Sequence, residues 1–144
     1  MFMGEFRHNV DEKGRIIMPA RFREELGESF VITKGLDRCL FVYPQQEWQS
    51  LTARLKDLPF TRSDARAFVR FFFSGAAECG CDSQGRTVVP SNLREYGQLD
   101  REAVIIGVGN RIEIWSDLAW DEFEESAEEN YEETAEKLTE MDLF

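Results

Sequence analysis

Short apolar segments recur along the chain and are separated by turn residues. Four of them are rich in β-branched and aromatic side chains, at 30–33, 39–43, 103–106 and 111–115. This pattern is typical of short strands, and the glycine-rich turns between neighbouring segments predict two hairpins. Two further strands are predicted at 15–18 and 86–89, each ending at a proline, which cannot donate to a sheet ladder.

Helices are predicted where the apolar spacing lengthens. Short helices should follow the two prolines, over 21–26 and 92–96, since proline suits a first helical turn and glycine a helix end. Longer helices are expected in the linker segment 48–75. The first of them should end at Pro59, and the second should begin with Ser63 as its N-cap. The apolar positions of this linker and of the C-terminal segment both keep helical spacing. In the C-terminal segment these positions are Phe123, Ala127, Tyr131, Thr134, Leu138 and Met141.

The chain contains an internal repeat at an offset of 71 residues. Asp11, Gly14, Arg15 and Pro19 recur as Asp82, Gly85, Arg86 and Pro90. We therefore divide the chain into repeats at 5–47 and 76–119, a helical linker at 48–75 and an acidic amphipathic helix at 120–144. A module of this size rarely buries enough apolar surface alone, so the repeats are expected to interlock around one core with an internal pseudo-two-fold axis.

The acidic residues are concentrated at one end of the chain. The 144 residues have a net charge of −11, and residues 121–144 hold eleven acids against Lys137, a net charge of −10. The rest is nearly neutral and can still present a local basic surface. No segment is long and apolar enough for a membrane span. The number of cysteines, three, is odd, and their spacing does not suggest disulfide pairs. An acidic residue also stands near the start, where an export signal would be basic. The sequence therefore predicts a cytoplasmic protein.

The repeated motif resembles that of a known family. Asp11-Glu-Lys-Gly-Arg15 and Asp82-Ser-Gln-Gly-Arg86, each followed by an apolar run and proline, are similar to the Asp-x-x-x-Arg motif of the MraZ family, and the paired modules resemble the SpoVT/AbrB class. The likeness covers about residues 1–140. It implies an α+β fold in which both repeats form a swapped-hairpin β-barrel of AbrB type, with linker and C-terminal helices.

The same resemblance implies a function. It predicts a sequence-specific DNA-binding transcription regulator, nucleoid-associated, that represses the division and cell-wall gene cluster through short direct repeats in its own promoter. It also implies assembly into ring-shaped homo-oligomers. The alternative is a protein-interaction module, like a toxin–antitoxin component, whose acidic tail holds a partner.

The two loops supply the candidate DNA-binding residues. Arg15 and Arg86 each follow a glycine turn, formed around Gly14 and Gly85, and a guanidinium suits bidentate contact with guanine or phosphate. The alternative is that Asp11 and Asp82 only close the turns through ion pairs with these arginines. Lys13 lies in the first loop, whereas Gln84 takes its place in the second, so unequal contributions are expected.

Further basic residues flank the loops. Arg7 and His8 precede the first loop, and Arg21, Arg23 and Arg94 follow the two prolines. As a set they would suit phosphate positioning, and individually each is compatible with ordinary solvated surface. Apolar residues that remain outside the core, among them Phe2, Phe6 and part of 71–73, are expected to join protomers.

Metal binding and catalysis are not expected. Cys79 and Cys81 are one residue apart, and Cys39 and His8 are distant in sequence, whereas structural zinc sites usually use Cys-x₂₋₄-Cys pairs. With one histidine, the chain has no nucleophile–base set. Gly107 and Gly109 are better explained by a tight hairpin turn than by a phosphate loop. We therefore predict neither an enzyme nor a cofactor.

Overall fold

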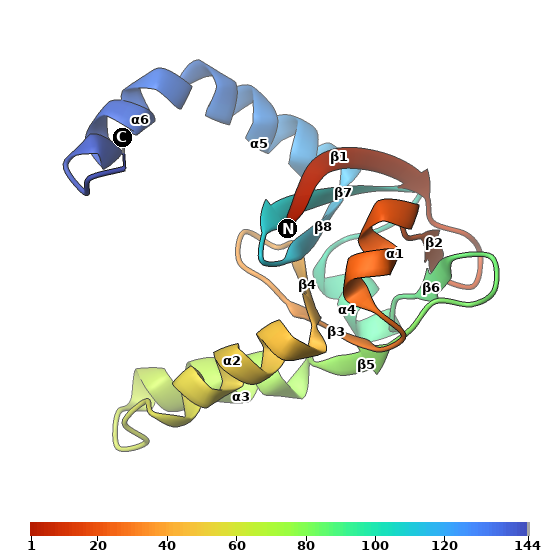
Figure 1. Ribbon diagram of the computed structural model, residues 1–144, viewed down its shortest axis with the longest axis horizontal. Helices are drawn as coiled ribbons and strands as arrows, with labels where there is room; N and C mark the ends of the chain where they lie inside the picture. Colours follow the sequence, from red (N-terminus) through yellow and green to blue (C-terminus); the bar gives the residue numbers. More distant parts are fainter. Residues whose placement is uncertain (144) are drawn as a thin grey trace.

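Strands from both halves of the chain share one antiparallel sheet (Figure 1). The structure is a computed structural model that describes residues 1–143, and its architecture is α+β. The strands of this sheet are β1 (Phe2–Asn9), β3 (Phe30–Lys34), β4 (Leu40–Pro44), β5 (Ala77–Cys79), β7 (Glu102–Gly109) and β8 (Ile112–Ser116). Their order across the sheet is β1-β7-β8-β4-β3-β5.

The outer strands of the sheet are exchanged between the repeats. β1, from the first repeat, pairs along its whole length with β7 of the second, from Phe2 opposite Gly109 to Asn9 opposite Glu102. β5, which opens the second repeat, pairs with β3 of the first. The remaining strands, β2 (Arg15–Ile17) and β6 (Arg86–Val88), form a separate two-stranded ribbon, again with one strand from each repeat. Neither repeat therefore completes its own sheet.

The sheet does not close, so the expectation of a closed β-barrel was wrong. Its edges are β1 and β5, and among the described residues these strands pair on one side only. The physical reason is that β2 and β6 pair with each other rather than with an edge of the large sheet. An open six-stranded sheet and a short ribbon thus replace a continuous barrel.

One hydrophobic core lies between the large sheet, the ribbon and two short helices. The helices are α1 (Ala20–Leu26) and α4 (Ser91–Tyr96), and each follows one of the repeated prolines as predicted. The fully enclosed side chains come from both repeats: Ile16, Met18, Phe30, Ile32, Leu40, Val42, Val89, Leu93, Ile105, Ile112 and Ile114. The size argument for a shared core is therefore consistent with the structure.

A second apolar cluster covers the opposite face of the sheet. It includes Phe41, Tyr43 and Trp115, against which the linker helix α2 (Gln45–Lys56), helix α3 (Ser63–Ser74) and helix α5 (Asp117–Glu129) pack. Trp48 of α2 stacks on Phe72 of α3 with 5.6 Å between ring centroids. Helix α3 begins at Ser63, with Arg62 as its N-cap and no side-chain cap bond, so Ser63 is not the cap we expected.

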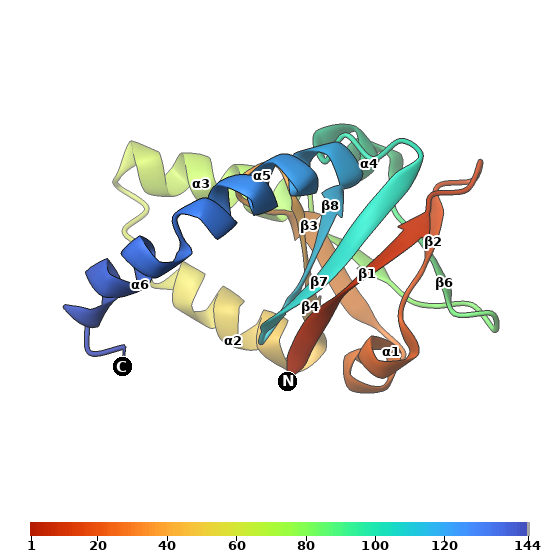
Figure 2. The same cartoon turned by 90° about the horizontal axis from the view of Figure 1, so that it is seen from above.

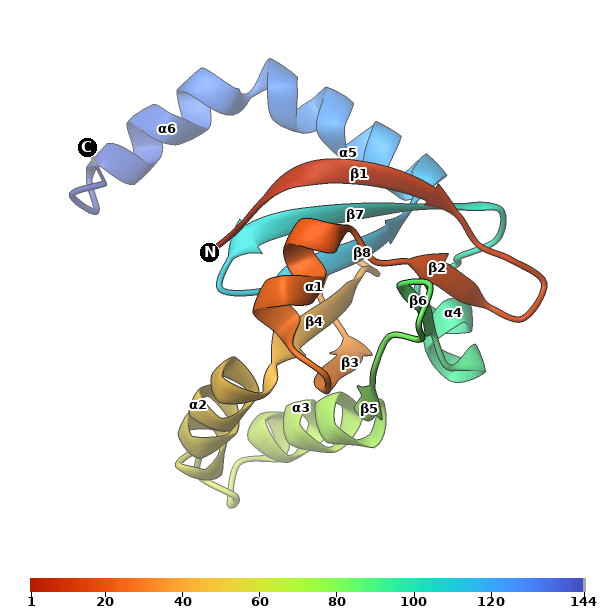
Figure 3. The same cartoon turned by 45° about the vertical axis from the view of Figure 1, so that its right-hand side comes forward.

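The C-terminal segment is two helices rather than one. Helix α5 ends at Glu129, and α6 (Tyr131–Thr139) follows after Asn130. Only the beginning of α5 is packed on the sheet, where Phe123 meets Trp115 at 5.1 Å between ring centroids. Helices α5 and α6 together form an arm, residues 117–143, which leaves the sheet beyond this contact (Figures 1 and 3).

The N-terminal aromatic residues belong to the core. Phe2 is 2% exposed and packs edge-on against Phe22, and the half-buried Phe6 contacts the same ring. Our expectation that Phe2 and Phe6 join protomers was therefore wrong, because β1 lies over α1 and turns these rings inward. Phe71, by contrast, is 52% exposed.

The molecule has two distinct ends along its long axis. The ribbon β2–β6 and the loops that lead into it lie at one end, and the helices α2, α3 and α6 lie at the other (Figures 1 and 2). The repeated motif and the acidic arm are therefore well separated in space.

Candidate nucleic-acid interface

The first loop is closed by the carboxylate of Asp11. One oxygen, Oδ1, accepts hydrogen bonds from the backbone N–H groups of Lys13 (3.0 Å) and Arg15 (2.8 Å). The other, Oδ2, accepts one from Arg15 Nε at 2.6 Å. Gly14 has φ +76°, a left-handed conformation that glycine adopts without steric cost. The Asp-x-x-Gly-Arg spacing thus encodes a turn that also orients its arginine.

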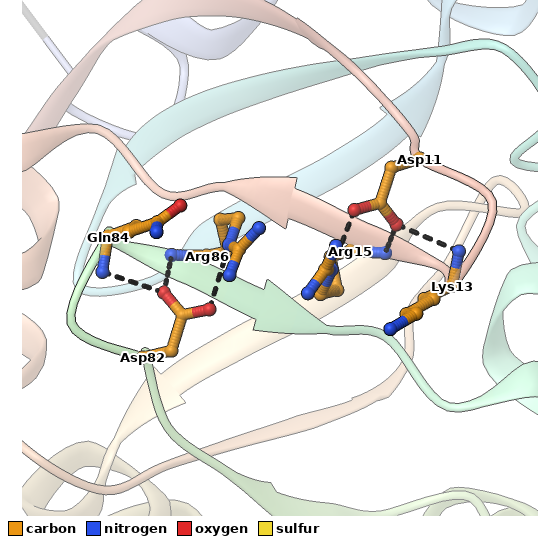
Figure 4. A network of polar contacts seen from close by, with 6 residues as sticks. All are labelled: Asp11, Lys13, Arg15, Asp82, Gln84 and Arg86. Atoms are coloured by element: carbon orange, nitrogen blue, oxygen red, sulfur yellow. Dashed lines mark hydrogen bonds and ion pairs between the residues drawn. The ribbon is translucent and has the colours of Figure 1, made fainter.

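The second loop repeats this geometry. Asp82 Oδ1 accepts from the N–H groups of Gln84 and Arg86, both at 2.9 Å, and Oδ2 accepts from Arg86 Nε at 2.8 Å. Gly85 has φ +78°. Figure 4 shows the two arrangements side by side on the ribbon. The ion pair that we considered as an alternative role for these residues is therefore present in both repeats.

The ion pairs occupy only one edge of each guanidinium. Arg15 and Arg86 use Nε for the aspartate, and their Nη groups make no hydrogen bond with any residue in 1–143. The side chains are part-exposed, at 24% and 29%. An arginine held at Nε presents its Nη groups in a fixed direction, which suits bidentate contact with a guanine edge or a phosphate.

The loop carboxylates are ionised at neutral pH. The hydrogen bond from the backbone N–H of Arg15 is the main reason that the pKa of Asp11 is below its ordinary value; desolvation opposes it, and hydrogen bonds from the Arg15 side chain and the Lys13 N–H add to the lowering. Arg86 acts in the same way on Asp82. Each Asp–Arg pair is therefore locally neutral, and Lys13 is a cation that the second loop lacks, although Glu12 beside it leaves both loops with the same net charge.

The two arginines share one face of the ribbon. Arg15 lies opposite Val88, and Arg86 lies opposite Ile17, so the arginines are diagonal neighbours across the two strands. The residues between them, Ile16 and Thr87, point inward and are fully buried. Because strand side chains alternate in direction, both guanidinium groups project outward from the same side.

Each loop is supported from beneath by an arginine of the other repeat. Arg23 Nη1 donates to Met18 O (2.6 Å), and its guanidinium lies against Gly85, where any Cβ would collide with it. Arg94 donates to Val89 O and lies against Gly14 in the same way. In the sequence Arg23 and Arg94 belong to a basic set that suits phosphate positioning, with ordinary solvated surface as the alternative for each, and in the structure they support the loops. Their matched positions in the repeat were the signal in the sequence.

Backbone hydrogen bonds also link the two loops. Met18 N–H donates to Gly85 O and Val89 N–H donates to Gly14 O, each at 2.9 Å. The two glycines are buried, so a side chain at either position would disturb both contacts and φ. The loops are therefore a single cross-braced unit rather than two independent turns.

Arg7 and His8 do not join this unit. Arg7 Nη2 contacts Asp121 of α5 at 2.6 Å, and Glu102 and Glu5 lie within 3.5 and 3.8 Å of the guanidinium. The hydrogen bond to Asp121 is the main reason that the pKa of Arg7 is raised. His8 is half-buried in β1 opposite Ala103. The basic set expected from the sequence is thus dispersed, and Arg7 fastens the arm to the sheet.

The cysteines are placed as packing residues. Cys79 ends β5, and Cys81 lies beyond it, and both pack against the main core. Burial raises the pKa of Cys79 to about 11, and it also raises those of Cys81 and Cys39. These thiols are therefore protonated at neutral pH, whereas nucleophiles and metal ligands are thiolates. Within residues 1–143 no group of three metal-binding side chains is found.

A helix that crosses a bilayer must be long and apolar. No helix within residues 1–143 is suited to crossing a bilayer.

The fold and the site together define a class of protein. It is a duplicated α+β protein whose two Asp–Arg loops form one arginine-bearing ribbon over a shared core. The family model described as "MraZ protein, putative antitoxin-like" matches residues 1–71 and again residues 72–142. The chain belongs to the MraZ family, and its internal repeat is confirmed.

Relatives match the chain over nearly its whole length. Proteins named "Transcriptional regulator MraZ" are 61% identical in Desulforamulus reducens over 141 residues, 98% of this chain and 99% of the relative. Those of Moorella thermoacetica and Heliobacterium modesticaldum are 60% and 62% identical over 143 residues, 99% of this chain and 100% of each relative. The name describes a regulator of transcription, which is not a class of enzyme.

Proposed function

We propose that this protein is a transcription regulator that binds double-stranded DNA sequence-specifically through the ribbon β2–β6. The observation that carries the proposal is the pair of outward arginines, Arg15 and Arg86, each held at Nε by an aspartate. The major groove, about 12 Å wide, admits a two-stranded ribbon, and a bidentate arginine–guanine contact is its commonest specific contact. The aspartates orient the arginines, and the arginines read bases.

The remaining loop residues position the protein on the duplex. Lys13, exposed in the first loop, is a phosphate contact without a counterpart at Gln84. Phosphate contacts set register and orientation rather than sequence. The two repeats, at 5–47 and 76–119, therefore contribute similar base contacts and unequal backbone contacts.

The proposed target comes from the family resemblance, and the name of the relatives supports regulation of transcription. We propose that the protein represses the division and cell-wall gene cluster through short direct repeats in its own promoter, within the cytoplasmic nucleoid. Footprinting of the purified protein on DNA preceding its own gene tests this. Protection of regularly spaced direct repeats is expected. Absence of any protected site there or on other genomic fragments would contradict DNA binding.

Several copies are needed for firm binding. One chain presents two arginines and one lysine at the ribbon, so it makes few of the ionic contacts that dominate affinity for DNA. Repeating the ribbon around a homo-oligomeric ring lets neighbouring copies occupy successive direct repeats, and the effective concentration then multiplies modest affinities. We therefore propose that the protein works as a closed ring.

The helical end offers the surfaces for this assembly. An apolar groove of about 330 Å³ lies between the sheet and the α2–α3 pair; its lining includes the exposed Leu36, Phe68 and Phe71, and its charged lining residue is Lys34. The arm carries the complementary features, since it is acidic and exposes Tyr131 (74%) and Leu138. We propose that α6 of one copy docks into this groove on the next. Such unlike surfaces close into a ring or extend as a filament.

The arm also supports the second candidate function, capture of a partner protein. Its exposed apolar side chains and its net charge of −10 over residues 121–144 would suit a basic partner. A gel shift on the promoter DNA and a pull-down with and without residues 130–144 separate the two functions. A specific shift supports the regulator, and retention of a partner only by the intact arm, without a shift, supports the alternative.

A further inference from the structure

The outer face of the ribbon carries two apolar side chains beside the arginines. Ile17 is 43% exposed and Val88 is 52% exposed. In the strand register, Val88 lies directly opposite Arg15 and Ile17 directly opposite Arg86. Each guanidinium therefore has a β-branched apolar neighbour across the ribbon, and the two pairs are related by the internal repeat.

Packing inside the protein does not account for these side chains. The inward positions of the same strands are filled by Ile16 and Thr87, which are 1% and 0% exposed. Isolated exposed apolar residues need no special explanation. Here, however, the exposed residues occupy equivalent positions in both repeats, and each lies beside a proposed base-reading arginine. Together they form a four-residue surface that alternates between charged and apolar.

The major groove of DNA offers a complementary pattern. Guanine presents two acceptors, O6 and N7, whereas thymine presents the C5-methyl group, the apolar group of that groove. Directly opposed residues in an antiparallel pair have Cβ atoms about 4.5–5.5 Å apart, close enough to reach the edges of neighbouring base pairs. A guanidinium and an adjacent apolar tip can thus contact a guanine and a neighbouring thymine together.

We propose that Ile17 and Val88 are specificity-determining residues that contact thymine methyl groups next to the guanines read by Arg86 and Arg15. The inference rests on the proposed DNA-binding function and adds the class of base step that it selects. Ile17 has one more methylene group than Val88, so the contact beside Arg86 should discriminate more strongly. The ligand is B-form DNA in which a guanine and a thymine are neighbours at both contact points.

Deoxyuridine substitution tests this contact without changing the protein. Uracil pairs with adenine as thymine does but lacks the C5-methyl group. In the fragment located by footprinting, each thymine of the protected site is replaced in turn, and the affinity is measured by fluorescence anisotropy. Wild-type protein should lose roughly fourfold in affinity at one or two positions, as expected for one buried methyl group. Equal affinities at every position would overturn the inference.

Variants assign the contact to its residue. Ile17→Ser and Val88→Ser should each bind the thymine fragment more weakly and lose discrimination at one position only, with melting temperatures confirming that the proteins fold. Leu118→Ser, at a 79% exposed position on α5, is the matched control and should discriminate as wild type does. If both ribbon variants still discriminate at every sensitive position, the assignment is wrong. If wild-type protein protects no fragment, the proposed function itself fails, and the inference fails with it.

Discussion

Asp11 and Asp82 combine two roles that are often treated as alternatives. Each closes its turn through backbone N–H groups and also holds the Nε of the arginine four residues later. Because the pKa of both carboxyl groups is lowered, any stabilisation they provide is present above the unfolded pKa and is lost as the pH falls through the lowered folded pKa. The loops should therefore keep their geometry throughout the neutral and mildly acidic range.

Replacement of the loop arginines should separate recognition from stability. Arg15→Ala and Arg86→Ala are each expected to weaken specific binding by about 1–3 kcal/mol, the usual contribution of a bidentate base contact. Their melting temperatures should change little, because exposed ion pairs contribute little to stability. Operator titrations and thermal melts measure the two effects. Unchanged affinity with a lower melting temperature would show that the pairs only close the turns.

Lys13→Ala is the matched control for those variants. A phosphate contact carries no sequence information, so its loss should weaken specific and non-specific binding alike. It should also reduce the slope of log affinity against log salt concentration by about 1. A loss confined to the specific site would instead place Lys13 among the base-reading residues.

The glycines of the loops should be coupled to the arginines beneath them. Gly14→Ala places a Cβ at a positive φ and against the Arg94 guanidinium, so it should lower both stability and DNA affinity. In an Arg94→Ala background the collision is absent, and the additional cost of Gly14→Ala should fall to that of backbone strain, about 1–3 kcal/mol. Urea unfolding of the four proteins measures the coupling. Simple additivity would contradict the cross-bracing.

At the scale of elements, the ribbon β2–β6 has an inner face that is not symmetrical. Ile16 and its partner Thr87 occupy equivalent positions in the repeats and are both buried. The hydroxyl Oγ1 of Thr87 has no hydrogen-bond partner among the described residues. A buried polar group without a partner lowers stability. Strand β6 therefore buries an unsatisfied hydroxyl group that β2 does not have.

Thr87→Val should therefore stabilise the protein. It removes the hydroxyl and keeps the β-branched shape, and a gain of about 1 kcal/mol in the free energy of unfolding is expected. Ile16→Thr, the matched change on the other strand, should destabilise the fold by introducing a second such group. Urea titration gives both values. A loss of stability in Thr87→Val would show that the hydroxyl is satisfied in solution.

At the scale of the whole molecule, the proposed DNA-binding and assembly surfaces lie at opposite ends. The ribbon lies at one end and helices α2, α3 and α6 at the other (Figure 2), so the proposed ring can present the ribbons while the arms and grooves join its members. Within residues 1–143 the arm is fastened near its start, by Arg7 to Asp121, by Trp120 Nε1 donating to Glu5 Oε1, and by Phe123 on Trp115. In the proposed ring, the rest of the arm docks on the next copy.

Two deletions should distinguish the packed and the projecting parts of the arm. Removal of residues 130–144 should leave the melting temperature nearly unchanged, whereas removal of 117–144 should lower it, because Trp120 and Phe123 are then lost from the second apolar cluster. Non-specific DNA binding should increase mainly at low salt, where charges are weakly screened. Equal protease sensitivity throughout 117–143 of the intact protein would contradict this division.

The shorter deletion also tests assembly. If α6 docks into the groove of the next copy, residues 1–129 should be smaller in solution than the intact protein, and Phe71→Ser should have the same effect. Light scattering measures the molar mass of both variants in solution. As that mass falls, their affinity for DNA that carries several repeats should fall too. Gln46→Ser, at an exposed position of α2 outside the groove, is the control. A monomeric intact protein would overturn the ring.

The sequence by itself determined the features that depend on neighbouring residues. The spacing of Asp11, Gly14 and Arg15 encodes a turn whose hydrogen bonds span five positions. The recurrence of this motif 71 residues later predicted the second loop. Six of the strands and the two short helices followed in the same way from alternation, proline and glycine. Their boundaries differ from the predicted ones by at most one residue, except that β7 extends three residues further, to Gly109. The pattern did not predict β1 and β5, which are the two edge strands of the sheet.

Only the tertiary structure decided which surfaces these elements bury. Pairing of β1 with β7, the open edges of the sheet and the inward turn of Phe2 all depend on contacts between the repeats, which local periodicity does not encode. The same holds for charges: Arg7 is bound by Asp121, 114 residues away, and Arg94 lies beneath Gly14. A basic residue in the sequence is a free cation only if the fold brings it no carboxylate or carbonyl, and that depends on residues far along the chain.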